Sequence, residues 1–163
     1  MREKLDKVME WILIVLMSLM TLDVLWGVFT RYVVGSQAPW SEELARYLLI
    51  WIGILGAAYA SGKHMHLSID LFPESLSPTK RRKLMVIINL LVIFFVVAAM
   101  VIGGSRLVYV VSYLGQESAA LKWPLGAIYT VMPISGIIIV YHKILDIIDE
   151  LNTDRSPVQQ TEP

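Results

Sequence analysis

The residues in this chain that could do chemistry are few, and the first is a charge placed inside an apolar segment. Asp23 stands near the middle of the first apolar run. A charge inside a membrane span costs roughly 2.5–3.5 kcal/mol on insertion scales, so it requires a partner. Asp23 therefore allows three interpretations: a protonated or hydrogen-bonded carboxyl, a contact with a partner subunit, or an ion-coupling site.

Histidines offer a second possibility. His64 and His66 are one residue apart and are followed by Asp70. This spacing is loose and the chain has no cysteine, so we expect no metal centre. Haem between spans needs histidines facing each other inside the bilayer, and neither this pair nor His142 is placed deep enough. The sequence also has no Ser/His/Asp set, phosphate-binding Gly-rich loop or paired carboxylates, which predicts a protein that is not an enzyme.

The elements that carry these residues are long apolar runs. The 163 residues are 56% hydrophobic and only 17% charged, and a run of about 20 apolar residues crosses a bilayer. We predict an all-α integral membrane protein with one four-span domain at 1–151 and a disordered tail at 152–163. The formal net charge of +0 gives no indication of a nucleic-acid partner. The predicted spans are 9–34, an uncleaved anchor, then 41–61, 84–114 and 124–141, the last continuing as a helix to 151.

Three residues give local predictions about where these helices start and bend. Ser41 follows a short turn and is predicted to cap the second span, because a serine side chain accepts a hydrogen bond from the first helical N–H groups. Pro124 is predicted to open the fourth span, where its missing N–H costs little. Pro133 lies inside that span and should kink it.

The distribution of Lys and Arg predicts the orientation. With both termini in the cytoplasm, the inner segments hold ten Lys or Arg residues, whereas the outer loops hold only Lys122. Cytoplasmic loops carry the excess of positive charge, so we predict that both ends are cytoplasmic and that the outer loops are short. A basic cluster closes the longer inner loop and is expected to touch anionic lipid headgroups: Lys80, Arg81, Arg82 and Lys83.

Two further groups of residues could hold helices together. Five charges share a depth near the outer surface, and we expect them to form an ion network that either fixes the first two spans or forms a docking rim. These are Arg31, Glu42, Glu43, Arg46 and Arg106. Small residues also recur at helical spacing in the second span, at Gly53, Gly56, Ala57 and Ala60. Such spacing lets membrane helices approach closely, either within this chain or against another protein.

The second span also carries a recognisable pattern. It reads Trp40-Ser41-Glu42-Glu43-Leu44-Ala45-Arg46-Tyr47, followed by Trp51, by Gly56-Ala57-Ala58, and by His64 and Asp70. This resembles the small membrane subunit of tripartite ATP-independent periplasmic (TRAP) transporters. Pro124, Tyr129 and Pro133-Ile134-Ser135-Gly136 are similar to the last span of that family. The resemblance covers about residues 8–150.

The resemblance implies a role in the bacterial inner membrane. In such systems a periplasmic binding protein captures an organic anion, often a C4-dicarboxylate or a sialic acid. It delivers the anion to a large sodium-coupled membrane subunit that works by an elevator-type motion. The small subunit would be a scaffold that binds no cofactor, with sodium on the large partner.

The residues expected at the partner interface fall into two groups. The outer rim comprises Trp40, Glu42, Glu43 and Arg46, and the lateral packing surface comprises Asp23, Trp51, Gly53, Gly56 and Ala57. Two other functions compete with this one. One is a self-sufficient, proton-coupled transporter that works as a homo-oligomer through Asp23. The other is a haem-binding membrane anchor for a redox enzyme.

Overall fold

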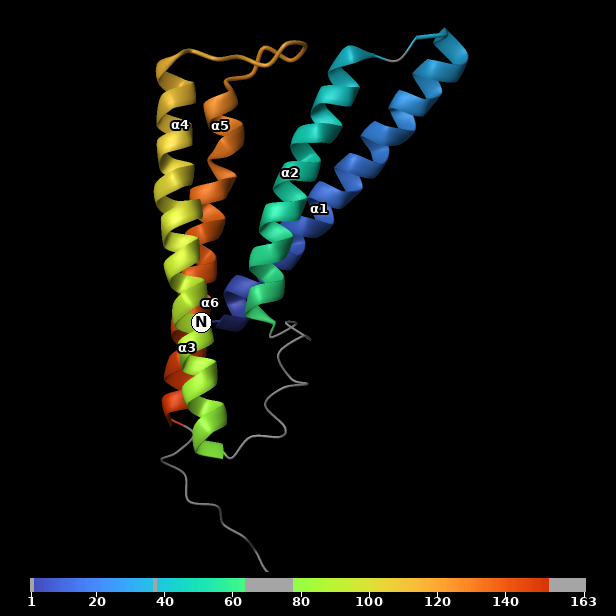
Figure 1. Ribbon diagram of the computed structural model, residues 1–163. Helices are drawn as coiled ribbons and strands as arrows, with labels where there is room; N and C mark the ends of the chain where they lie inside the picture. Colours follow the sequence, from blue (N-terminus) through green and yellow to red (C-terminus); the bar gives the residue numbers. More distant parts are fainter. Residues whose placement is uncertain (1, 37, 64–77, 153–163) are drawn as a thin grey trace, which may run out of the picture.

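A computed structural model describes residues 2–36, 38–63 and 78–152 (Figure 1). In these ranges the regular secondary structure is helical, apart from an isolated bridge between Glu117 and Pro124, and short turns or loops lie at 35–36 and 114–124. The elements are α1 (Arg2–Phe29), the π-helical turns η1 (Thr30–Val34), α2 (Pro39–Gly62), α3 (Pro78–Val96), the π-helical segment η3 (Val97–Gly103), α4 (Gly104–Tyr113), α5 (Leu125–Tyr129) and α6 (Val131–Asn152). The predicted all-α architecture is confirmed for this part of the chain.

Four helical stretches of the described chain are long and apolar enough to span a membrane. They are Lys4–Val34, Pro39–Gly62, Lys83–Tyr113 and Leu125–Leu151. Large apolar side chains stay exposed along them, with Phe94 72% exposed, as expected of helices that face lipid. The four predicted spans therefore correspond to four candidate membrane helices, with ends shifted by a few residues. The basic cluster expected to close a loop lies instead in the first turns of α3.

The helices form two hairpins. α1 packs along α2, while α6 packs on α2, on α3 and on η3, and α4 packs on α5. Figure 1 shows the α1–α2 hairpin leaning away from α4 and α5 toward one end of the molecule. We call this the loop end, because the turn at Gly35 and the 114–124 loop lie there. The opposite end, where α1 and α3 begin and α2 and α6 finish, is called the terminal end.

The hydrophobic core lies where the two hairpins meet. Met9, Ala58, Val96 and Ile139 form one buried cluster, with one side chain each from α1, α2, α3 and α6. Gly62 lets α2 approach α6 closely at this level, since a Cβ on Gly62 would lie 2.8 Å from Cε1 of His142. The core therefore joins all four spans at a point where α2 and α6 nearly touch.

The start of α2 differs from the prediction. The helix begins at Pro39, and Ala38 is the N-cap residue, with no side-chain cap hydrogen bond. The prediction of a Ser41 cap was wrong because proline is pre-organised for the first helical position, which moves the start two residues earlier. Ser41 is 2% exposed, and its Oγ donates to the Asp23 carbonyl oxygen at 3.1 Å. Ser41 thus joins α2 to α1 instead of capping α2.

The fourth span is broken where proline predicts a break. Pro124 is the N-cap residue of α5, and α5 ends at Tyr129, before α6 starts at Val131. Pro133 has no N–H to donate to the Tyr129 carbonyl four residues earlier, which explains an interruption one turn ahead of it. Beyond this point α6 runs without a break to Asn152, as the sequence predicts.

Candidate functional site

Glu43 joins the two hairpins at the loop end. Its Oε1 accepts a hydrogen bond from the N–H of Ala119 at 2.9 Å. Its Oε2 accepts from the N–H groups of Ala120 at 2.8 Å and Leu121 at 2.9 Å. The Tyr47 hydroxyl donates to Oε1 at 3.0 Å. Consecutive N–H groups that converge on one point form an anion-binding nest, and here a carboxylate of the same chain fills it. We call this arrangement the Glu43 clasp.

Other hydrogen bonds fix the loop and hold it to α2. The Ser118 N–H donates to the Trp123 carbonyl at 2.8 Å, and the Leu125 N–H donates to the Gln116 carbonyl at 3.0 Å. The indole N–H of Trp51 donates to the Ile128 carbonyl at 3.0 Å. The Glu43 carboxylate and the Trp51 indole, both expected at a partner interface, are therefore engaged within this chain.

The predicted ion network of five residues does not form in the described part of the chain. Among these five residues only Arg46 and Glu42 form an ion pair, with 3.2 Å between Nη2 and Oε1. Their side chains are 64% and 63% exposed. Glu43 binds backbone N–H groups instead, and Arg106 lies on α4, in the other hairpin. Arg106 does not reach the other four charges because the two hairpins diverge toward the loop end (Figure 1).

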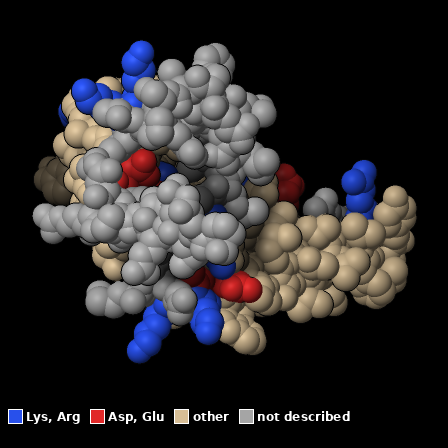
Figure 2. All heavy atoms as spheres, turned by 90° about the horizontal axis from the view of Figure 1, so that it is seen from below, with Lys and Arg blue, Asp and Glu red and all other residues tan. Residues whose placement is uncertain are grey.

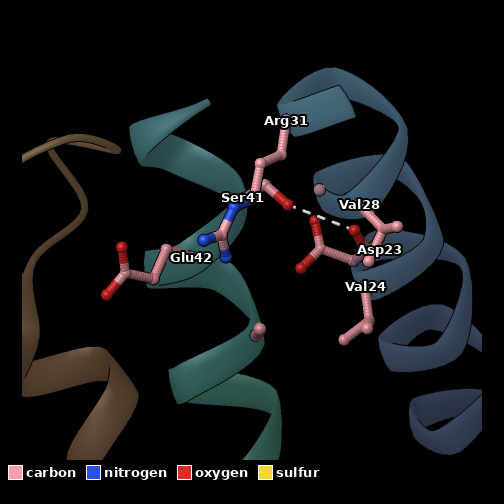
Figure 3. Close-up of a pocket in the computed structure, with 8 residues that line it drawn as sticks. Asp23, Val24, Val28, Arg31, Ser41 and Glu42 are labelled. Atoms are coloured by element: carbon pink, nitrogen blue, oxygen red, sulfur yellow. Dashed lines mark hydrogen bonds between the residues drawn. The ribbon is translucent and has the colours of Figure 1, made fainter. Parts of the chain in front are cut away.

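Asp23 lies in a pocket of about 180 Å³ between α1 and α2 (Figure 3). Asp23 is 7% exposed, and within the described ranges neither of its carboxylate oxygens has a hydrogen-bond partner. Figure 3 shows the carboxylate turned toward α2, with Arg31 reaching across from η1 and the Glu42 carboxylate pointing away. The remaining lining residues are Val24, Gly27, Val28, Ser41 and Ala45.

The outward side of α2 carries small residues with open space beside them in the described part of the chain. Gly53 and Ala57 are exposed, and a Cβ built on Gly53 or Gly56 would meet no atom within 4 Å. Packing within the chain, one of the two interpretations above, therefore does not explain Gly53 and Gly56. Steps of three and four residues place six residues on this side. We call it the open stripe: Glu42, Arg46, Leu49, Gly53, Gly56 and Ala57.

With this geometry described, comparison with known proteins gives the family. Residues 7–153 match the family model described as "Tripartite ATP-independent periplasmic transporters, DctQ component". The chain belongs to the DctQ family. This is a family of transporter components and not of enzymes, and it agrees with the resemblance found in the sequence.

Individual members are similar over part of their length. The chain is 32% identical to the sialic acid TRAP transporter small permease protein SiaQ of Vibrio cholerae over 82 residues, which are 50% of this chain and 47% of SiaQ. It is 27% identical to the C4-dicarboxylate TRAP transporter small permease protein DctQ of the same organism over 79 residues, which are 48% of this chain and 34% of that protein. The chain thus spans about half or less of the length of these curated relatives.

A third match is to a much longer protein. The chain is 43% identical over 56 residues to the sialic acid TRAP transporter permease protein SiaT of Haemophilus influenzae. These residues are 34% of this DctQ-family chain but only 9% of SiaT.

The terminal end of this DctQ-family chain holds a buried polar cluster that the sequence reading missed. His142 is fully buried, and its Nε2 lies 3.2 Å from Oδ1 of Asp6. The Lys143 Nζ donates to Oδ2 of Asp146 at 3.1 Å, and both side chains are buried. The spacing of Lys143 and Asp146 is a helical pairing signal, but nothing in the sequence connects His142 with Asp6, because they lie on different helices.

The basic cluster at the start of α3 lies at the terminal end. Figure 2 shows Lys and Arg side chains projecting from this end in several directions, and Lys80 and Lys83 are exposed. His64, His66 and Asp70 lie outside the described residues. Among the residues that are described, no three His, Cys, Asp or Glu side chains gather as a metal site.

Proposed function

We propose that this chain is the small scaffold subunit of a TRAP transporter. It supports a large, sodium-coupled, elevator-type subunit during binding-protein-dependent uptake of an organic anion. The observation that carries this proposal is the open stripe of α2 in a chain of the DctQ family. Small residues let membrane helices approach closely, and a Cβ added at Gly53 or Gly56 would meet no atom of the described chain within 4 Å. A membrane helix of the large subunit packs against it.

The proposed interface runs from the loop end down α2. Trp40, Glu42 and Arg46 form its exposed rim, and Gly53, Gly56 and Ala57 form its close-packed part. Two of the expected interface residues act indirectly. Glu43 and Trp51 hold the 114–124 loop and α5 in place beside α2, so they shape the surface without donating polar atoms to the partner.

The orientation proposed from the sequence places this surface in the inner membrane of a bacterium. With both termini in the cytoplasm, the loop end faces the periplasm, where the substrate-binding protein arrives. The basic cluster then lies at the cytoplasmic face, against anionic lipid headgroups: Lys80, Arg81, Arg82 and Lys83.

The relatives support the class of substrate and of partner. SiaQ and DctQ are named for sialic acid and for C4-dicarboxylates, and both ligands carry carboxylates. The SiaT match shows a similar segment in a permease of far greater length, which supports a large permease as the neighbour of this chain. In this proposal the binding protein selects the anion, and the large subunit binds both the anion and the sodium.

Co-purification in a gentle detergent tests the proposal. The tagged chain, taken from its native membranes, should carry a stoichiometric partner with many spans and several hundred residues. Ala57→Leu should lose most of that partner, because the added side chain keeps a helix away from the stripe. Ala99→Leu is the matched control, since Ala99 is also exposed on an apolar helical segment, η3. Recovery of the chain with only itself would contradict the scaffold function. Equal losses of the partner in Ala57→Leu and Ala99→Leu would contradict the role of the open stripe as the interface.

The unpartnered carboxyl of Asp23 favours a second candidate, a proton-coupled transporter made of this chain alone. A buried acid without a hydrogen-bond partner can carry a proton across part of a membrane. Liposomes containing only this chain, with a pH-sensitive dye inside, test this under a potassium-driven potential. Proton entry that is lost in Asp23→Asn would establish the second candidate. Equal dye signals from the wild type and Asp23→Asn would contradict it and favour the scaffold function.

A further inference from the structure

The feature that the scaffold function does not yet explain is the isolation of Asp23. Both carboxylate oxygens are buried and accept no hydrogen bond. The residue faces α2 in the loop-end half of the α1–α2 hairpin, within a candidate membrane span (Figure 3). Burying a charged carboxylate without a partner is strongly unfavourable, so such a group is expected to have a partner in the working assembly.

Four donor side chains described on η1 and α2 do not pair with the Asp23 carboxylate. The Ser41 Oγ donates to the backbone carbonyl of Asp23 and not to its carboxylate. The Thr30 hydroxyl donates to the Gly27 carbonyl at 3.0 Å. Arg46 pairs with Glu42, and Arg31 lines the pocket without forming an ion pair with Asp23. The eight residues from Asp23 to Arg31 rise about 12 Å along α1 and η1, which is a long reach for a direct pair.

The pocket is placed where a partner helix would pass. Glu42 and Ala45 line the pocket, and Glu42 is also the first residue of the open stripe. A helix that packs along the stripe therefore runs past the mouth of the Asp23 pocket. The cavity of about 180 Å³ equals roughly six water volumes, at about 30 Å³ each, which is enough for an ammonium or guanidinium group.

We infer that a Lys or Arg side chain from a membrane helix of the large subunit enters this pocket and pairs with Asp23. This inference rests on the proposed function, because it needs the large subunit on the open stripe. Small residues provide close approach but little selectivity, whereas a buried charge accepts an opposite charge and rejects an apolar side chain. Asp23 thus makes assembly with the large subunit selective, while the open stripe lets the two helices pack closely.

Co-purification of Asp23→Asn with the large subunit gives the first test. The asparagine keeps the shape of the side chain but removes its charge, so recovery of the large subunit should fall at least about tenfold. Glu117→Gln removes an exposed acid from the 114–124 loop, outside the proposed interface, and should recover the partner as the wild type does. The isolated Asp23→Asn chain should melt no lower than the wild type, because its carboxyl holds no contact there. Normal recovery of the partner, or an unfolded isolated chain, would overturn the inference.

A suppressor selection gives the second test and identifies the partner residue. Asp23→Lys should abolish uptake, and selection for restored uptake should return Lys or Arg changes to Asp or Glu in one membrane helix of the large subunit. Suppressors at Arg31 of this chain would overturn the inference and show that the pair forms within α1. A wild-type chain that recovers no large subunit sinks the proposed function itself. Normal recovery by Asp23→Asn, beside a wild-type chain that binds its partner, removes only the Asp23 pair.

Discussion

Two sides of α2 carry small residues of the same types, glycine and alanine, but the two sides differ in what lies against them. On the packed side Ala58 and Gly62 are buried, and the imidazole of His142 lies against Gly62. On the open stripe Gly53 and Gly56 have only open space beyond their Cα atoms. Small residues at helical spacing therefore do not tell whether a helix packs inside its own chain or outside it. The two sides of α2 differ in whether another helix of this chain, here α6, packs against them.

The largest expected effect separates the two sides by adding the same bulk to each. A Cβ on Gly62 would lie within 3.0 Å of three ring atoms of His142, and that ring is buried and cannot move aside freely. Gly62→Leu should therefore destabilise the detergent-solubilised chain by about 1–3 kcal/mol or more. Gly56→Leu should change its stability by less than about 0.5 kcal/mol. Thermal unfolding of both variants measures this.

Gly62→Leu and Gly56→Leu can also show that the two sides of α2 do not differ. If Gly56→Leu destabilises the isolated chain as much as Gly62→Leu does, the stripe is a packing surface of this chain and not a free one. The complementary readout is recovery of the large subunit. Gly56→Leu should lose it while the chain stays folded, because its added side chain projects only outward.

The helices of this chain were predictable, because each depends on a local property. Runs of about 20 apolar residues mark the spans, and Pro133 marks where α5 ends, whereas the start of α2 at Pro39 was missed in favour of a Ser41 cap. The stripe itself was also visible as a periodic pattern at Gly53, Gly56 and Ala57. The pattern could not show which side of α2 would be covered, since that depends on how α6 and α1 pack.

The contacts between distant residues were not predictable. Glu43 accepts hydrogen bonds from N–H groups 76 to 78 residues away in the chain, and backbone N–H groups carry no sequence signature. The His142–Asp6 contact was missed for another reason, since it depends on how α1 packs beside α6. Sequence reasoning paired charged side chains with one another, whereas Glu43 found backbone donors and Asp23 found no donor at all.

A second prediction tests how the packed side of α2 holds the loop end. Removing the carboxylate in Glu43→Ala leaves the amides of Ala119, Ala120 and Leu121 without their acceptor. Their hydrogen exchange should become roughly tenfold faster while the helices stay protected. Glu42→Ala is the matched control, because its neighbouring carboxylate contacts none of these amides. Unchanged exchange in Glu43→Ala would mean that the clasp does not hold the loop in solution.

A smaller effect is expected lower on the same side of α2. Trp51→Phe keeps the aromatic packing but removes the N–H that donates to the Ile128 carbonyl at 3.0 Å. Loss of one such hydrogen bond should cost about 0.5–1.5 kcal/mol, read as a lower melting temperature. Trp11→Phe provides the reference, since Trp11 is 69% exposed on α1. A melting point equal to that of Trp11→Phe would show that the Trp51 indole bond contributes nothing measurable.

The smallest effect on the fold is expected at Arg46, at the loop end of the open stripe. Its pair with Glu42 joins two exposed side chains one helical turn apart, so Arg46→Ala should change stability by less than about 0.5 kcal/mol. The same change should lower both recovery of the large subunit and uptake, because the guanidinium belongs to the proposed rim. A small effect on the fold makes this the cleanest readout of the interface, since a loss of assembly cannot then come from unfolding. Wild-type uptake and assembly in Arg46→Ala would remove Arg46 from the rim and confine the interface to the small residues below it.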